Sequence, residues 1–256
     1  MRFLYVAPRY HTNQVPIIRG LKRKGHEVCF LSQYAGKVED YSDLTPTVIG
    51  YSGFFLFFDR IYMALMKNRD AYAGDRKMKC GFPPIGKLKR AIRDSHGDVA
   101  ILRERSVYSI CAYLLCKKYK IPAILYNQSP LWEDCIKNDP AHRLMRLLTP
   151  TVRMTPVMGV QDGRKVKEPG AAFVPFVMEP EQKAEEKRWI KDSITHIFSI
   201  GKYEERKNHR MLMEIVEELS AVYNIHLTIA GERTTSAHQA YYDRLAAYIA
   251  DHGLQD

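Results

Sequence analysis

Short apolar runs alternate along this chain with longer segments whose apolar residues recur every three to four positions. The apolar runs of strand length cover residues 3–7, 27–31, 98–102, 123–126, 153–156 and 173–175. Between the third and fourth of them, residues 107–119 have the length and spacing of a helix. Strands that alternate with helices are typical of a parallel sheet with helices on both faces. The pattern therefore predicts an α/β fold.

The first helix is predicted over residues 13–24, between the first two strands. Thr12 stands where an N-cap hydroxyl belongs, and Pro16 is tolerated because it falls in the first turn. Gly25 ends the helix, and the second strand begins shortly after it.

The segment from residue 197 onward carries the clearest chemical signal in the chain. An apolar run, 197–200, ends at Gly201, and three cations follow it closely: Lys202, Arg206 and Lys207. A strand that runs into the start of a helix directs free backbone N–H groups and the positive end of the helix dipole outward. Such a place favours anions, and phosphate above all. The alternative is that a short basic cluster at a helix start is only a solvated face.

The elements after this turn complete a strand–helix–strand unit. A helix is predicted from Asn208, its N-cap, because apolar residues recur at helical spacing as far as Val222. A further strand, Ile225–Ala230, closes on Gly231. The last helix is predicted over residues 236–252, with Gly253 as its C-cap and with Tyr242, Leu245, Ala246 and Ile249 on its core face.

This unit resembles the donor-binding unit of the retaining GT-B-fold glycosyltransferases (the glycosyltransferase family 4, or group 1, type). Their pattern is a strand, Gly-Arg, an acidic loop, (Arg/Pro)-Lys-(Gly/Asn), a helix, a strand and Gly-(Glu/Gly). Here the pattern reads Gly201-Lys202, Glu204-Glu205, Arg206-Lys207-Asn208 and, after the second strand, Gly231-Glu232. The resemblance implies that Gly201, Lys202, Arg206 and Lys207 bind the donor diphosphate. Lys202 departs from the usual arginine, so it keeps the charge and loses the bidentate fork.

The resemblance also implies the domain organisation. We expect a complete N-terminal Rossmann-like domain over residues 1–180 on the acceptor side, a linker over 181–193, and a partial nucleotide-sugar domain over 194–256. The family's later pair of glutamates, eight residues apart, has no counterpart in this chain. We therefore expect a glycosyltransferase truncated in its donor domain, and we assign no catalytic residue.

Two loops that follow strands are predicted to contact the substrates, because open α/β sheets place ligands at the carboxyl ends of their strands. One loop carries His11, Thr12 and Asn13. The other carries Asn127 and Gln128, where many relatives have a histidine that touches the donor sugar. In the second domain, Gly231 and Glu232 complete the set of expected cleft contacts.

The expected activity is hexosyl transfer from a UDP- or GDP-type sugar to a glycan or lipid-linked acceptor, impaired in a truncated chain. Cations placed at the diphosphate stabilise the charge that develops as the glycosidic bond loosens. We therefore expect neither a metal nor a cofactor, and the sequence contains no Asp-x-Asp motif. Two alternatives remain open: a GT-B-fold epimerase or phosphorylase, and a noncatalytic basic domain that docks on membranes.

Charge is unevenly distributed in the chain. Residues 1–180 contain 29 Lys and Arg against 16 Asp and Glu, a net charge of +13, whereas residues 181–256 carry 10 against 13, or −3. This asymmetry points to an anionic partner such as a membrane surface, or to a bland excess of solvated lysines. Nucleic acid is not expected, because no nucleic-acid motif accompanies the charge.

Composition and hydropathy add the expected location. The five cysteines show no metal or disulfide spacing, which suits a reducing cytoplasm. No apolar run reaches the eighteen residues of a membrane span. We expect a cytoplasmic protein of cell-envelope or polysaccharide biosynthesis, peripheral on the inner face of the membrane.

One aromatic segment has two interpretations. Residues 53–67 contain four phenylalanines and are followed by a tract rich in Lys and Arg that runs to residue 93. Aromatic residues beside cations suit an interfacial membrane helix. The other interpretation is a buried core helix followed by an exposed loop.

Overall fold

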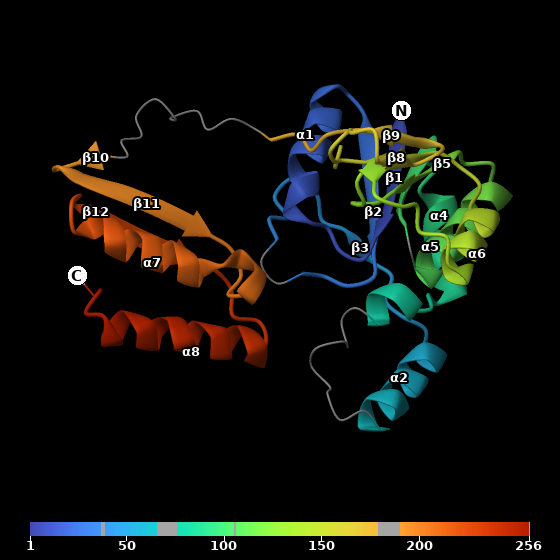
Figure 1. Cartoon of the computed structure of the whole chain (residues 1–256). Coiled ribbons are helices and arrows are strands. Elements are labelled where there is room, and N and C mark those ends of the chain that lie inside the picture. The colour runs from blue at the N-terminus through green and yellow to red at the C-terminus, as the bar shows by residue number, and fades with distance from the viewer. Residues whose placement is uncertain (37–38, 66–75, 105, 179–189, 256) are drawn as a thin grey trace. The chain divides into compact units, whose positions relative to one another are not determined.

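A computed structural model describes residues 1–36, 39–65, 76–104, 106–178 and 190–255 (Figure 1). The chain divides into two compact units, Met1–Glu179 and Pro180–Asp256. The boundary between them falls in the segment 179–189, so most of the predicted linker lies outside the described residues. Its last part is structured: Ile190–Lys191 form a short strand, β10, that pairs antiparallel with the next strand.

The first unit is built on a seven-stranded sheet in the order β3-β2-β1-β4-β5-β7-β9, and every pairing in it is parallel. The strands are β1 (Arg2–Ala7), β2 (Glu27–Ser32), β3 (Thr47–Val48), β4 (Val99–Arg103), β5 (Ala123–Tyr126), β7 (Arg153–Thr155) and β9 (Ala171–Phe173). The predicted strands are confirmed to within a few residues at each end. The short β3 was not predicted, because two residues carry no periodic signal.

Alternating side chains of β1 divide the core of this unit into two layers. Leu4 and Val6 pack with α4 (Ile85–Asp94) and α5 (Val107–Lys118) on one face of the sheet. Tyr5 and Ala7 pack on the other face, where α1 (Val15–Arg23) lies. This two-sided burial is why strands of a parallel sheet read as continuous apolar runs.

The start of the first helix differs from the prediction. A 3-10 helix, Thr12–Gln14, precedes α1, and its N-cap is His11 instead of Thr12. His11 accepts from the backbone N–H of Asn13 through Nδ1 at 3.3 Å. The side chain of Gln14 accepts from the backbone N–H of His11 at 2.9 Å, which completes a capping box.

Four further elements were not predicted. They are helices α4 and α6 (Pro140–Leu148) and the strands β6 (Trp132–Glu133) and β8 (Val166–Lys167), which pair with each other. The two helices were missed because cations separate their few apolar positions. Only Leu88 and Ile92 of α4 are fully buried. Four residues apart on one side of the helix, they suffice to attach it to the sheet.

The second helix corrects one interpretation of the aromatic segment. Helix α2 (Gly53–Leu65) forms as expected, yet its apolar side faces outward and only Asp59 is buried. The interpretation as a buried core helix is therefore wrong for the described part of the chain. Lys67 lies outside the described residues.

The second unit contains β11 (Ile194–Ile200), α7 (His209–Ser220), β12 (Ile225–Ala230) and α8 (Ser236–Asp251), close to the predicted bounds. Strands β11 and β12 are parallel, with Ile200 opposite Ala230. The core is formed by Tyr203, Met213, Tyr241, Leu245 and Tyr248. Tyr241 and Tyr248 were not on the predicted core face of α8, and Ala246 of that face is exposed.

Candidate functional site: the turn between β11 and α7

The candidate site of the second unit lies where β11 and β12 end. The backbone N–H of Gly201 donates to the carbonyl of Ala230 at 2.9 Å, so the two parallel strands stay paired to their last residues. Beyond this bond, Gly231 lies against Gly201 so closely that a Cβ atom at position 231 would stand 1.7 Å from the Gly201 carbonyl oxygen. Only glycine fits this approach.

The chain between Gly201 and α7 is more ordered than the sequence indicated. A 3-10 helix, Glu205–Lys207, ends at Asn208, whose backbone is left-handed with φ 51° and ψ 39°. Asparagine tolerates this conformation better than most residues. Asn208 is the N-cap residue of α7, as predicted, but within the described residues its side chain makes no capping bond to the helix and donates to the sulfur of Met211. Asn208 makes the corner before the helix.

The three predicted cations differ in their surroundings. The aliphatic stem of Lys207 lies over Gly201, with its Cδ and Cε 3.5 Å from the place of a Cβ at residue 201. Lys202 follows Gly201 directly in the sequence, and its side chain is exposed. Arg206 is 70% exposed and pairs with Glu204, Nε to Oε2, at 2.5 Å. The glycine therefore gives Lys207 room to cross the strand end, while an acidic neighbour binds Arg206.

Glu204 connects this turn to the loop that follows β12. Besides Arg206, the Glu204 carboxylate lies 3.5 Å from Nε2 of His238 in the first turn of α8. The other nitrogen of His238 lies within hydrogen-bonding distance of the backbone N–H of Thr234, at 3.3 Å, and of its hydroxyl, at 3.1 Å. Sequence reasoning missed His238, because it is more than thirty residues from the turn and only the pairing of β11 with β12 brings the two loops together.

His209, the first residue of α7, is a second group that the sequence did not reveal. Its imidazole is buried between the rings of Tyr203 and Tyr241, with Nε2 at 3.3 Å from the carbonyl oxygen of Lys202. Its Nδ1 has no hydrogen-bond partner among the described residues. His209 thus fixes the backbone of Lys202 from beneath the turn.

The remaining predicted residue of this unit, Glu232, has an exposed side chain. Its carbonyl accepts from the backbone N–H of Tyr203 at 3.4 Å. The structure therefore brings Gly201, Lys202, Lys207 and Gly231 together at one end of the sheet, with Glu232 at its margin.

In the first unit, a cavity of about 280 Å³ lies at the carboxyl ends of the parallel strands. Its lining residues are Pro8, Met78, Lys79, Arg103, Glu104, Ser106, Asn127, Gln128 and Ser129. The predicted pair Asn127 and Gln128 is therefore part of a real cavity. Gln128 is exposed and accepts from Arg103 at 3.3 Å.

Asn127 is buried, and its amide is already bound within the protein. It donates to the carboxylate of Glu104 and accepts from the backbone N–H of Ser129 at 3.1 Å. Glu104 in turn binds Nε of Arg153 at 2.7 Å. Asn127 consequently holds the loop after β5 in place beside the cavity.

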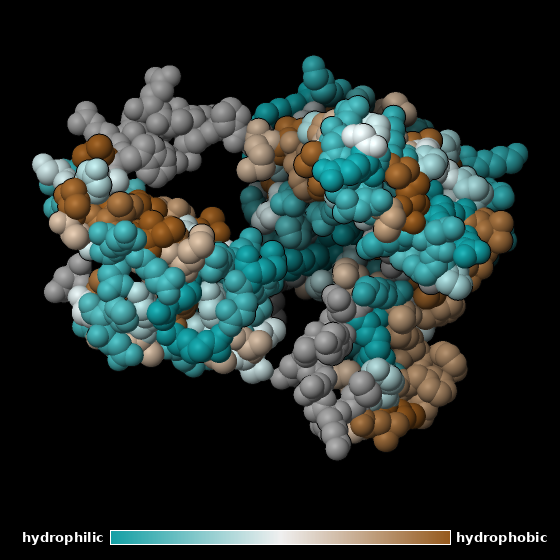
Figure 2. All heavy atoms as spheres, in the orientation of Figure 1, coloured by the Kyte–Doolittle hydropathy of each residue, from teal (hydrophilic) through white to brown (hydrophobic). Residues whose placement is uncertain are grey.

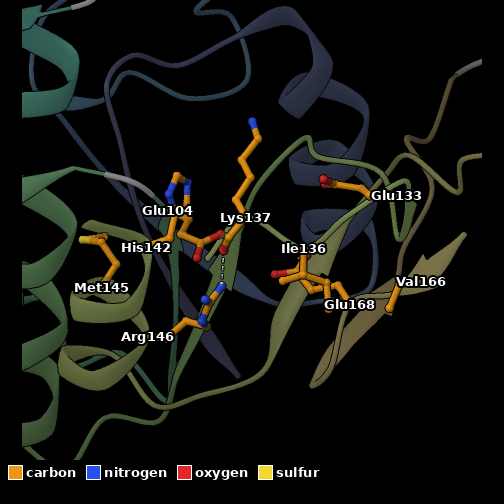
Figure 3. A pocket seen from close by; sticks show the side chains of 9 residues that line it. All are labelled: Glu104, Glu133, Ile136, Lys137, His142, Met145, Arg146, Val166 and Glu168. Atoms are coloured by element: carbon orange, nitrogen blue, oxygen red, sulfur yellow. Dashed lines mark hydrogen bonds between the residues drawn. The ribbon is translucent and has the colours of Figure 1, made fainter. Parts of the chain in front are cut away.

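A second hollow opens on the other side of this polar network (Figure 3). Glu104, which follows β4, and Glu168, which follows β8, both line it. Arg146, another lining residue, donates to the carbonyl of Lys137 at 3.0 Å. Its volume is about 20 Å³, which is room for about one water molecule and too little for a sugar. This hollow belongs to the buried network, whereas the cavity of about 280 Å³ has room for a larger ligand.

The loop with His11, Thr12 and Asn13 lies at the end of β1, but its polar groups serve the local fold. Nδ1 of His11 faces both the Asn13 N–H and the Thr12 hydroxyl, the latter at 3.2 Å. Burial lowers the pKa of His11, and the nearby charge of Arg9 lowers it further, against the opposing effect of Glu39. At neutral pH this histidine is therefore an uncharged cap.

No model of a protein family matches the chain, and no curated protein matches its sequence. Solved structures do match it. A trehalose-6-phosphate structure from E. coli bound with UDP-2-fluoro glucose has a TM-score of 0.57 at 13% identity and aligns with 98% of this chain and 70% of its own. The glycotransferase of kitacinnamycin has a TM-score of 0.52 at 16% identity and aligns with 92% of this chain and 67% of its own.

The chain has the GT-B fold. A UDP-forming α,α-trehalose-phosphate synthase from Burkholderia xenovorans supports the same conclusion, with a TM-score of 0.54, 12% identity, and 98% and 69% of the two chains aligned. The predicted fold class is thereby confirmed. This chain spans between 67% and 70% of the length of these three GT-B structures.

Two features are absent from the described residues. In that part of the GT-B chain, no group of three or more His, Cys, Asp or Glu is arranged to hold a metal ion. Among the described helices, none combines the length and hydropathy needed to cross a bilayer.

Proposed function

We propose that this chain is a hexosyltransferase that binds a nucleotide-diphosphate sugar at the turn between β11 and α7. The observation that carries the proposal is the position of Lys207, whose stem crosses Gly201 at the end of a parallel strand and before a helix. A diphosphate at this turn would meet the charges of Lys202 and Lys207 and the positive end of the α7 dipole.

The donor is proposed to be a UDP-type or GDP-type sugar. Two structures of the same fold support the UDP form, since one is bound with UDP-2-fluoro glucose and the other is named a UDP-forming enzyme. As the diphosphate leaves, negative charge grows on its oxygens, and cations fixed near them stabilise this charge more than they stabilise the ground state. Arg206 joins them when its side chain exchanges Glu204 for phosphate.

The acceptor is proposed to bind in the cavity at the carboxyl ends of β1, β4 and β5. Arg103 and Lys79 supply positive charge there, and Gln128 supplies a side-chain amide. Such a lining suits a glycan or lipid-linked acceptor that carries a phosphate. We also propose a peripheral location on an anionic membrane and a role in building surface polysaccharide.

Isothermal titration calorimetry with UDP and GDP tests the donor site. We expect binding that Lys207→Gln weakens about tenfold or more, because a hydrogen bond to a charged group contributes about 1.5–3 kcal/mol. Lys191→Gln removes an exposed lysine of β10 in the same unit and is the matched control. Circular dichroism checks that both variants keep the fold.

Lys202→Arg tests the same site through an expected increase in affinity. An arginine restores the bidentate geometry, so the affinity for the diphosphate should rise. Nucleotide binding that is absent, or unchanged in Lys207→Gln, would refute the proposed site.

A further inference from the structure

Helix α2 has an exposed side made of apolar residues. They recur at helical spacing and are Phe54, Phe57, Phe58, Ile61, Tyr62 and Leu65. The two ends of the row are the most accessible, with Phe54 73% and Leu65 79% exposed. Figure 2 shows the brown and tan surface that they form on the part of the first unit that α2 builds in Figure 1. A row of this size marks a place where something binds.

The side of α2 that faces the protein is polar at its centre. Asp59 is buried, and its carboxylate binds the guanidinium of Arg76 and lies 3.4 Å from Nζ of Lys77. Arg76 also stacks on the ring of Tyr62 at 4.1 Å. Asp59 thus holds the polar side of the helix against the protein while the apolar row faces outward, the reverse of a helix that covers a core.

Several cations lie close to this apolar row along the chain. Arg60 is exposed on α2 itself, and Asp59 binds Arg76 and Lys77 of the helical residues 76–80, which also include the exposed Lys79. Exposed Lys89 and Arg90 follow on α4. The sequence from 51 to 93 contains ten Lys and Arg against three Asp. A partner that complements this segment is therefore apolar where it meets the row and negatively charged where it meets the cations.

A second copy of this chain does not meet that requirement. In a two-fold symmetric dimer through α2, each row would face its own copy, and two strongly basic segments would be brought together. Like charges placed opposite each other at an interface cost several kcal/mol. An anionic bilayer offers hydrocarbon beneath a layer of phosphates, which matches both parts of the surface.

We propose that α2 lies in the interface of an anionic membrane. Its apolar row enters the boundary between headgroups and acyl chains, and the cations around it bind lipid phosphates. The same short segment then links membrane and cavity, because Lys77 binds Asp59 of α2 while Met78 and Lys79 line the cavity at the strand ends. This inference rests on the proposed peripheral location, specifies the element that makes the contact, and does not depend on the nucleotide site.

Flotation with vesicles tests it. Vesicles of phosphatidylcholine with phosphatidylglycerol should bind the whole chain, and vesicles of phosphatidylcholine alone should bind it weakly. The triple variant Phe54→Gln/Phe58→Gln/Leu65→Gln should bind at least about tenfold less, because three apolar side chains that would leave water on binding are lost. These side chains are exposed, so the fold should persist, which thermal unfolding checks.

A matched control has the same number of apolar side chains removed from another exposed part of the first unit. Leu144→Gln/Leu147→Gln/Val152→Gln alters residues that are all at least half exposed. This control should bind vesicles as the unaltered chain does, and so should Lys207→Gln. Equal binding by the α2 variant and the unaltered chain would overturn the inference, as would a defect of the same size in the control.

A second measurement locates the helix directly. In a variant with Phe58→Trp, lipids with brominated acyl chains should quench the new fluorescence. Absence of quenching in vesicles that bind the chain would overturn the inference. Sedimentation without vesicles tests whether a second copy of the chain binds α2 instead. Self-association of the unaltered chain that the α2 triple variant abolishes would overturn the membrane assignment and give this surface to a second copy.

Discussion

Gly231 and Gly201 are packed backbone to backbone: a Cβ atom at residue 231 would lie 1.7 Å from the carbonyl oxygen of Gly201. The contact joins the ends of two parallel strands and sets the position from which the Lys202–Lys207 turn departs. It also explains why two glycines about thirty residues apart belong to one site.

Gly231→Ala should therefore destabilise the second unit. Its methyl group would meet backbone, which cannot turn aside as a side chain can, and overpacking of this kind costs about 1–3 kcal/mol. Urea denaturation followed by circular dichroism measures the free energy of unfolding. Titration with UDP should show weaker binding as well, because the turn must shift.

Gly201→Ala is the control in the same turn. The nearest atoms to its Cβ are those of the flexible Lys207 side chain at 3.5 Å, an ordinary van der Waals distance. It should change stability much less than Gly231→Ala. Equal losses in the two variants would contradict the close approach.

The ion pair between Arg153 and Glu104 should stabilise the first unit strongly. Nε and Oε1 are 2.7 Å apart, and each side chain is only 7% exposed. Arg153→Met leaves the Glu104 carboxylate buried without its cation, which costs about 3–5 kcal/mol. The double variant Glu104→Gln/Arg153→Met should recover part of this loss. Urea denaturation measures the free energy of unfolding of both variants.

An exposed pair provides the comparison for this prediction. Arg93 and Asp94 are 2.8 Å apart, yet both are more than half exposed. Arg93→Met should lower the free energy of unfolding far less than Arg153→Met does, because an exposed ion pair contributes little. A loss for Arg153→Met that is as small as this would mean that the buried pair does not form.

Stability of the first unit should fall as the pH drops below about 6.5. Burial and Arg9 lower the pKa of His11 in the folded chain below its ordinary value of 6.5, so the unfolded chain takes up the proton first. Protonation also removes the Nδ1 acceptor that caps the 3-10 helix. His11→Asn keeps a capping oxygen and does not titrate.

Denaturation midpoints measured from pH 7.5 to pH 5 test this expectation. The unaltered chain should lose stability over this range, and His11→Asn should lose less. Parallel curves for the two proteins would show that His11 contributes nothing to the pH dependence.

Much of the sheet could be predicted from the sequence. Ala123–Tyr126 and Ile225–Ala230 form strands with the bounds expected, because each is a continuous apolar run between turn residues. The turn after Gly201 was also predictable, since a glycine and clustered cations between a strand and a helix form a local pattern. Proposals for Lys202 and Lys207 rest on that pattern and on their place at the strand end.

Other features could not be predicted, because they depend on residues distant in sequence. Asn208 caps α7 as expected, but it does so as a left-handed corner after a 3-10 helix that the sequence did not indicate. His238 reaches Glu204 only because β12 lies beside β11. Asn127 lines the cavity, but no local pattern indicated that its amide also binds Glu104 and Ser129.

The sequence by itself determined most of the segments that become strands and helices, because burial on both sheet faces demands apolar runs and a helix that packs on a core demands an apolar stripe. Tertiary structure alone decided which side of α2 faces the protein. Its composition fits a core helix as well as a membrane helix, and the choice follows from Asp59, whose buried charge binds Arg76 and Lys77 on the protein side. With that carboxylate facing inward, the phenylalanines on the opposite side of the helix face outward.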